Sequence, residues 1–361
     1  MDDPPMILER YIANNLVKGW LLVLLVLGSV FGLIGFVQEL DHTRFDYNAL
    51  AVGRYTLFSL PQQLVSLAPV IALLGSIVAL ASLDRFNELT IISCTGFSRA
   101  RLLLAIALPT LIFMALLWLS MEYVTPPMQQ SAEAERHALR YRNQVRIPDG
   151  GVWSKSGNRY IHLDKMHQGG IPGDIDLFEF DESGQLTRAL RAETARVSKD
   201  RTWLFQNVRE KRLVEGQLVT RSYPELTIGN LWSPDELPTL TLDSDSMRLS
   251  VLHNYSQYRA DNGQPNEKYL NTFWQKLLMP LTVGAMVLLA TPISANLGAR
   301  RDRSFGVDIA MGALVGILFY LGTQIVFALG QLLGLNIPLV ALAPTLVILL
   351  CAAVLLRRMR W

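Results

Sequence analysis

The sequence of 361 residues has little charge and almost no cysteine. Only 18% of its residues are charged, whereas 50% are hydrophobic. The two cysteines, Cys94 and Cys351, both lie outside the long polar region in the middle of the chain, so that region must be held together by packing without disulfides. This composition excludes an ordinary soluble domain and indicates a membrane protein.

The sequence also lacks the motifs of several enzyme classes. It contains no GxxxxGK[ST] loop, no HEXXH and no GxSxG, so we expect neither ATP hydrolysis nor a resident cofactor in this chain. His162, Asp164 and His167 are close in sequence, but such side chains in a turn-rich surface stretch are usually solvated, so we predict no metal site. A net charge of +2 gives no reason to expect a nucleic-acid partner.

Long uncharged runs are what the sequence has in abundance. A membrane-spanning helix needs about 20 apolar residues, and such runs extend over 19–38, 55–83, 102–121, 277–299 and 309–356. The last run has room for two helices separated by a tight turn at GLNIP. We therefore predict six transmembrane helices. No charged residue lies near the middle of any predicted span, which disfavours a proton- or sodium-coupled carrier.

Basic residues are distributed unevenly between the two sides of the predicted membrane. They cluster before the first run, after the second and fourth runs, and at the end of the chain: Arg10, Lys18, Arg85, Arg99, Arg101, Arg300, Arg301, Arg303, Arg357, Arg358 and Arg360. Because cytoplasmic segments carry an excess of Lys and Arg, we predict that both termini are cytoplasmic. The start, MDDPPMILER, is not typical of a cleaved signal, so the first run is expected to stay as a membrane span.

The short polar segment at 84–101, DRFNELTIISCTGFSRAR, is cytoplasmic in this topology. Asn87 can cap a two-turn helix that begins at Glu88, and Gly96 suits the position that closes it. One interpretation is a plain connector between two spans. The other is a coupling helix at 84–98, which fits a groove of a separate ATPase and offers its carboxylate to an arginine there. For that role we select Glu88, Asn87, Leu89, Ile92 and Gly96.

Residues 146–250 differ in character from the rest of the chain. Alternating patches with turn signals such as GGIPGD and DESG predict an antiparallel sandwich or jelly roll. The topology puts this all-β domain outside the membrane, which is the periplasm if the cell has an outer membrane. The predicted domains are therefore 1–145 with three spans and the coupling helix, 146–250 with the jelly roll, and 251–361 with a return segment and three spans.

The order of these parts resembles the LptF/LptG family of lipopolysaccharide export permeases. The similarity lies in ILERYI at the start, ELTIISCTGFSR in the loop, WSKSGNRYIHLD in the β domain and LHNYSQY before the fourth span. The loop and the LHNYSQY segment favour the LptG branch. The resemblance implies an LptF-type permease as partner, a dimer of the ATPase LptB that binds ATP and Mg²⁺, and LptC and LptA as further partners.

The resemblance also implies a path for lipopolysaccharide through a cavity walled mainly by spans one and five of both permeases, and then to the jelly rolls. Glu88 matches the family's coupling-helix glutamate, whereas Gly35 stands where LptG members often carry a lysine. Since lipid A carries phosphates, arginines at the outer membrane surface are suited to bind it: Arg136, Arg140, Arg142, Arg44 and Arg54. The other interpretation is surface charge that balances Glu133 and Glu135.

Two other functions fit parts of the sequence. A mechanotransmission subunit of a lipoprotein-handling ABC system also has a coupling helix and a periplasmic domain, but normally has four spans. A membrane enzyme that modifies envelope lipids needs clustered acids or histidines at one membrane face. The nearest to such a cluster are Glu39, Asp41, His42 and Asp46, which we interpret as interfacial loop charges.

Overall fold

The computed structural model describes residues 4–43, 47–140, 144–145, 151–167, 171–181, 183–198, 200–214, 217–229, 231, 243–298 and 305–358. Its α-helices are α1 (Pro4–Leu40), α2 (Ala49–Ser66), α3 (Ala68–Arg85), α4 (Glu88–Cys94), α5 (Arg99–Leu119), α6 (Thr125–Arg140), α8 (Leu249–Asp261), α9 (Glu267–Gly298), α10 (Phe305–Leu332) and α11 (Ile337–Arg358). Six helical segments in the described part of the chain are long and apolar enough to cross a membrane, which confirms the predicted number of spans.

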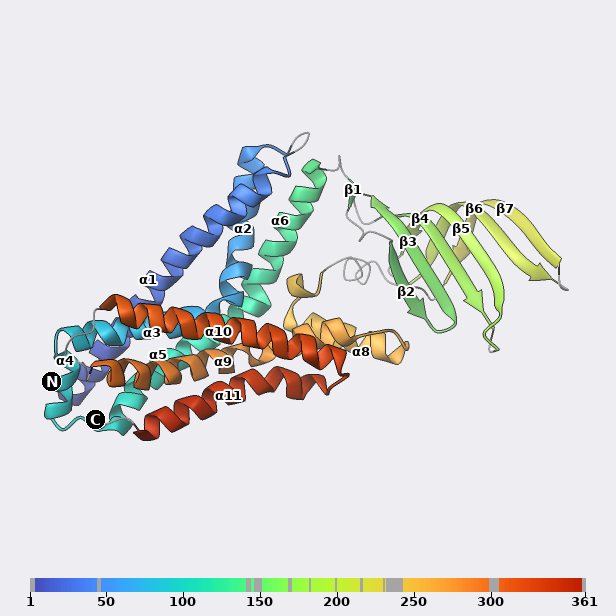
Figure 1. Ribbon diagram of the computed structural model, residues 1–361. Helices are drawn as coiled ribbons and strands as arrows, with labels where there is room; N and C mark the ends of the chain where they lie inside the picture. The colour runs from blue at the N-terminus through green and yellow to red at the C-terminus, as the bar shows by residue number, and fades with distance from the viewer. Residues whose placement is uncertain are drawn as a thin grey trace.

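The helices form an elongated bundle with the β domain beyond one end of it (Figure 1). Both chain termini and α4 lie at the opposite end, which we call the α4 end; the other is the sheet end. The bundle core is built from buried apolar side chains of α1, α3, α5 and α9, among them Leu16, Ile77, Leu102 and Met286. The second half of α1 leaves this core and runs beside α2 and α6 toward the sheet end.

The predicted span at 55–83 is two helices rather than one. The chain breaks at Leu67, between α2 and α3, and Pro69 lies in the first turn of α3. Proline has no N–H to donate and disfavours helical geometry in the residue before it, so it is suited to the start of a helix. Only α3 has the length and composition of a span in this region. The other half of the run, α2, packs against α1 and α6.

The third span continues into the next helix through a helical irregularity. A five-residue π-helical turn, η1 (Ser120–Val124), joins α5 to α6. Pro126 and Pro127 lie in the first turn of α6, where missing N–H groups cost little. The chain therefore continues as one long helical segment that carries α6 toward the β domain (Figure 1).

Two close contacts of glycines fix how the helices cross. A Cβ atom on Gly75 of α3 would lie 2.6 Å from Cδ1 of Trp20 on α1, so only glycine allows this approach. At the same crossing the Trp20 indole N–H donates to Ser76 Oγ at 2.9 Å. A Cβ on Gly312 of α10 would meet Ile77 of α3 at 2.7 Å, so a second close helix contact at a glycine lies within the chain.

The β domain is a single antiparallel sheet. Its strands are β1 (Gln144–Val145), β2 (Val152–Ser156), β3 (Arg159–His167), β4 (Ile171–Phe180), β5 (Leu186–Val197), β6 (Trp203–Val214) and β7 (Gln217–Ile228). From β3 to β7 the strands pair in chain order, and both β1 and β2 pair with β3. This confirms an all-β domain inserted between helices. The described strands form a meander, so the jelly-roll arrangement stays unconfirmed.

One face of the sheet packs on α8. Ile161, Leu177 and Leu190 pair across three neighbouring strands and share a buried core with Leu252 and Tyr255 of α8. The LHNYSQY segment is therefore helical and packs into the core of the β domain. Tyr269 and Phe273 at the start of α9 pack against the same core, so the last spans are directly connected to the sheet.

Candidate functional site

The short helix predicted to begin at Glu88 is present as α4, and Gly96 follows it as expected, whereas Asn87 lacks the extended backbone typical of a capping residue. Asn87 stands just before it with a left-handed φ of 57°, and its carbonyl accepts from the Ile91 N–H at 3.0 Å. Gly96 follows the helix with a φ of 83°, the conformation that favours glycine. Ser98 then accepts from the Arg101 N–H and caps α5. These local signals fix where the helix begins and ends.

The side chains of α4 are divided between the bundle and the surface. Ile92, selected as a coupling residue, is only 4% exposed and belongs to the bundle core, so it anchors α4 instead of offering a surface. Phe86 and Ile91 are 66% and 60% exposed beside Glu88. Sequence reasoning missed these two apolar residues, although Ile91 lies three positions after Glu88 and hence on the same helix face. The side chain of Leu89 lies outside the described part.

Glu88 makes a contact that was not foreseen. The Tyr11 hydroxyl of α1 donates to Glu88 Oε2 at 2.8 Å. The two residues are 77 positions apart and the bond is at the surface of the α4 end. No local sequence signal could have found this pair, because it depends on how α1 and α4 pack.

At the sheet end, Arg136 lies in a buried ion pair with the end of α1. Its Nε and Nη2 donate to the two carboxylate oxygens of Glu39 at 2.6 and 2.9 Å. Glu39 is only 8% exposed. Such a two-point pair is strong because the planar guanidinium matches the carboxylate. Arg136 therefore has a partner within the chain: Glu39 on α1 binds Arg136 on α6, the helix that leads toward the β domain.

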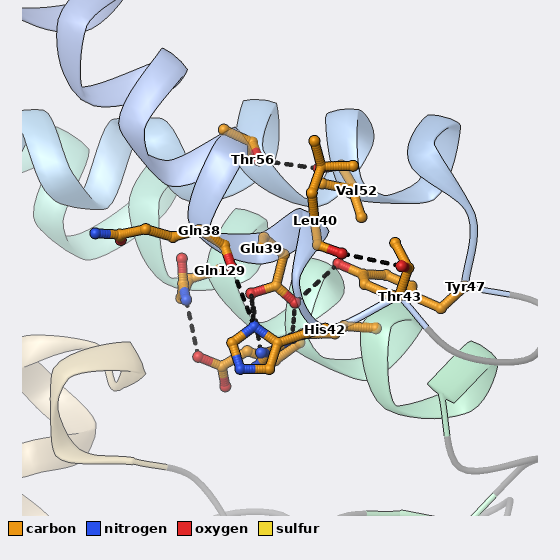
Figure 2. Close-up of polar contacts among 11 residues, drawn as sticks. Gln38, Glu39, Leu40, His42, Thr43, Tyr47, Val52, Thr56 and Gln129 are labelled. Atoms are coloured by element: carbon orange, nitrogen blue, oxygen red, sulfur yellow. Dashed lines mark hydrogen bonds and ion pairs between the residues drawn. The ribbon is translucent and has the colours of Figure 1, made fainter.

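Two tyrosines complete this cluster, and Figure 2 shows one of them, Tyr47, beside Glu39. The chain turns back after α1, and the Tyr47 hydroxyl donates to Glu39 Oε1 at 3.2 Å (Figure 2). Burial raises the pKa of the Tyr47 phenol, and the nearby Glu39 carboxylate raises that pKa further, so Tyr47 remains a neutral donor. The Arg136 guanidinium also lies 5.0 Å from the ring centroid of Tyr55 on α2. Helices α1, α2 and α6 are thus joined at one point.

The other predicted phosphate-binding arginines are placed differently. Arg54 is on α2, its side chain is 62% exposed, and it pairs with Glu135 of α6 at 3.0 Å. That pair agrees with the interpretation of surface charge balance. Arg140 is half-buried in the last turn of α6. Arg44 and Arg142 lie outside the described residues. None of these placements tests whether lipid phosphate binds there.

The histidines considered as metal ligands have other contacts. The His162 ring stacks on Trp153 with ring centroids 4.5 Å apart, and its Nδ1 lies 3.7 Å from Asp176 Oδ2. The side chain of His167 lies outside the described part. Among the residues searched, no group of three or more His, Cys, Asp or Glu is arranged to hold a metal ion.

A polar junction that the sequence did not predict connects the β domain to the spans. Glu122 of η1 accepts from the Leu249 N–H at 2.9 Å and from the Ser250 hydroxyl, so a carboxylate from span three caps α8. The buried Lys276 ammonium of α9 donates to the carbonyls of Asp245 and Met247, both at 2.7 Å. The short 3₁₀ turn η2 (Ser244–Ser246) is thereby fixed to α9.

Together these features define a polytopic membrane protein with an inserted β domain and a short helix at the opposite end of its bundle. The chain belongs to the family of lipopolysaccharide export system permeases LptF/LptG, whose model matches residues 10–358. The resemblance inferred from the sequence is confirmed, and the chain is a multi-pass protein of the inner membrane.

Two relatives show how far the similarity extends. The chain is 30% identical to the lipopolysaccharide export system permease protein LptG of Escherichia coli (strain K12), with 98% of both chains covered. It is 27% identical to the LptG of Haemophilus influenzae, over 98% of this chain and 99% of the relative. The similarity therefore includes the β domain and all six spans.

Proposed function

We propose that this chain is the LptG-type permease subunit of an ATP-driven transporter, which extracts lipopolysaccharide from the inner membrane and passes it to a periplasmic bridge. The observation that carries the proposal is the placement of α4 and both termini at one end of the bundle, with the β domain beyond the other, in a member of this permease family. A force applied to α4 has a continuous path of packed helices to the sheet.

In this proposal α4 is the coupling helix and faces the cytoplasm. Glu88 meets a cation of an LptB-type ATPase dimer, which binds ATP and Mg²⁺ and hydrolyses the nucleotide. The exposed side chains of Phe86 and Ile91 add an apolar contact beside the carboxylate. In the same proposal the β domain is periplasmic. An LptF-type permease completes the lipid cavity. LptC and LptA are the further partners, and they receive the lipid.

For lipid phosphates, the proposal retains the arginines of α2 and α6. Arg54 is the most accessible of those described, because its pair with Glu135 is on the surface and such pairs are weak. Arg136 has to exchange the Glu39 carboxylate for a phosphate before it contacts lipid. We therefore expect Arg54→Glu to weaken crosslinking of lipopolysaccharide to the cavity directly.

The lipoprotein-handling alternative is less well supported. Its subunits normally have four spans, whereas six segments of the described chain are suited to cross a membrane. For the lipid-modifying enzyme, the acids and histidine near the end of α1 were the nearest candidate cluster. Glu39 of that group is occupied by Arg136 and Tyr47, which disfavours a catalytic role for it.

The experiment that tests the proposal purifies the tagged chain in mild detergent and identifies what copurifies. We expect an ABC-type ATPase and a second permease with the wild-type chain, and less ATPase or uncoupled ATP hydrolysis with Glu88→Ala. Ile92→Ala is not a suitable control, because Ile92 is part of the bundle core. Glu135→Ala at the sheet end is suitable, because it also removes one accessible carboxylate. Normal coupled transport with Glu88→Ala would contradict the assignment.

The orientation has its own test. Cys94 on α4 is free and exposed, and Cys351 lies within the last span. In a Cys351→Ser variant, a membrane-impermeant maleimide should label Cys94 in inside-out vesicles and not in spheroplasts with an intact inner membrane. Labelling from the periplasmic side would overturn the topology.

A further inference from the structure

The hydrogen bond between Tyr11 and Glu88 connects the coupling helix to the first span. Tyr11 lies in the second turn of the described part of α1, and its hydroxyl meets Glu88 Oε2 at 2.8 Å. Glu88 is the first residue of α4 and the residue assigned to the ATPase contact. A carboxylate has two oxygens that accept several hydrogen bonds, so a tyrosine on one oxygen leaves room for a guanidinium on the other. The Tyr11 contact and an ATPase contact are therefore compatible.

This bond lies near the start of a helix that extends to the other end of the bundle, so it can transmit movement between the two ends. The helix α1 has 37 residues, so it extends about 55 Å and reaches from the α4 end to the sheet end. Its first half packs in the bundle core through Ile12, Leu16 and Trp20. Its second half leaves that core and ends at Glu39, in the ion pair with Arg136. A displacement of α1 at Tyr11 is thus carried along one continuous helix to Arg136, near the end of α6 that adjoins the β domain.

The remaining contacts of α4 lead elsewhere. Ile92 anchors α4 in the bundle core, and the helix packs mainly against α3, its neighbour in sequence. Movement of α4 through those contacts reaches α3 and the spans around it. The Tyr11 hydroxyl adds a link to α1, the helix whose second half is exposed along Leu25, Leu33 and Val37. This side is where a lipid or a second permease would lie.

We propose that Tyr11 is a positioning residue that joins Glu88 to α1, so that movement of the coupling helix during ATP hydrolysis is transmitted to the first span. The inference rests on the proposed role of Glu88 and adds to it a route and a residue. Its chemistry is one hydroxyl-to-carboxylate hydrogen bond. Removing the hydroxyl should leave the ATPase bound through Glu88 but should weaken the connection between ATP hydrolysis and lipid movement.

The test uses the assembled complex of this chain with its ATPase and partner permease in vesicles that contain lipopolysaccharide. The number of ATP molecules hydrolysed per lipopolysaccharide released is measured for Tyr11→Phe, Glu88→Ala and the double variant. We expect Tyr11→Phe to raise this ratio roughly fivefold, which corresponds to about 1 kcal/mol, the typical net contribution of a single hydrogen bond. The amount of copurified ATPase and the unfolding temperature should stay at wild-type values. Tyr123→Phe, an exposed tyrosine at the far end of span three, is the matched control and should change nothing.

The three variants separate the two proposals. If Tyr11 acts through Glu88, the double variant should have the same ratio as Glu88→Ala alone. A normal ratio with Tyr11→Phe, while Glu88→Ala is uncoupled, would overturn the role of Tyr11 and leave the coupling helix intact. Independent effects that multiply in the double variant would also overturn it. A normal ratio with Glu88→Ala would instead remove the proposed function of Glu88 itself.

Discussion

At the α4 end, α1 and α4 are joined by one hydrogen bond on the surface, between Tyr11 and Glu88. At the sheet end, α1 is held by a buried two-point ion pair between Glu39 and Arg136, with Tyr47 on the same carboxylate. The difference is one of burial. A surface bond exchanges readily with water and partners, whereas a buried pair leaves an uncompensated charge when it is broken. The α4 end is therefore suited to receive a partner, and the sheet end to hold its shape.

The largest effect should come from breaking the buried pair. Arg136→Ala leaves the Glu39 carboxylate buried without its cation, and we expect the free energy of unfolding to fall by about 3 kcal/mol. The measurement is thermal or denaturant unfolding of the full chain in detergent. Arg54→Ala removes a similar but exposed ion pair on the neighbouring helix, and should change stability by less than about 0.5 kcal/mol. Equal effects of the two substitutions would remove the distinction.

A smaller effect is expected where α1 crosses α3. In Gly75→Ala the new methyl group would lie 2.6 Å from Trp20 Cδ1 and 2.7 Å from its Cα, so the two helices must separate. We expect a loss of about 2 kcal/mol in the same unfolding measurement. Gly322→Ala on α10 has no atom within 4 Å of its new methyl group and should be neutral or slightly stabilising. A stable Gly75→Ala variant would show that the crossing tolerates a wider spacing.

The cap that joins span three to α8 should contribute less. Glu122→Ala removes the acceptor of the Leu249 N–H and of the Ser250 hydroxyl, and we expect a loss of about 1 kcal/mol. Because α8 belongs to the core of the β domain, protease sensitivity between α8 and the sheet should rise as well. The control is Glu135→Ala, which removes a carboxylate from a surface pair. If both variants have wild-type stability, Glu122 is not a significant cap.

The smallest effect on stability is expected at Tyr11. Because its bond to Glu88 is on the surface, Tyr11→Phe should change the free energy of unfolding by less than about 0.5 kcal/mol. The same substitution is expected to raise the number of ATP molecules hydrolysed per lipopolysaccharide released. A substitution at the α4 end should therefore change coupling with little loss of stability, whereas Arg136→Ala at the sheet end should lower stability. A large loss of stability with Tyr11→Phe would make the two ends alike.

The sequence predicted the class of fold because the signals for it are local. Uncharged runs of sufficient length gave six spans, and alternating patches gave the β insertion. Gly96 marked the end of α4, since the backbone conformation there depends on neighbours a few residues away. The family could be inferred for the same reason, from short ordered segments.

The sequence was less informative about which side chains of a helix are buried against other helices and which are exposed. It did not separate α2 from α3 at Leu67, and it selected Ile92 for the ATPase surface although that side chain is in the core. It offered Arg136 either as a phosphate ligand or as surface charge that balances Glu133 and Glu135, and it did not predict the ion pair with Glu39. A short amphipathic helix has several possible orientations, and packing against α3 and the core selects one of them.

By itself, then, the sequence determined that this chain crosses a membrane six times, carries a β domain between the third and fourth spans and has a short acidic helix in one loop. Those features follow from hydropathy, strand periodicity and turn chemistry along the chain. The tertiary structure decided which polar side chains meet: Tyr11 with Glu88, Glu39 with Arg136, and Glu122 with the start of α8. The physical reason is that these partners are 77 to 127 residues apart in sequence, so only the packing of the helices brings them within hydrogen-bond distance.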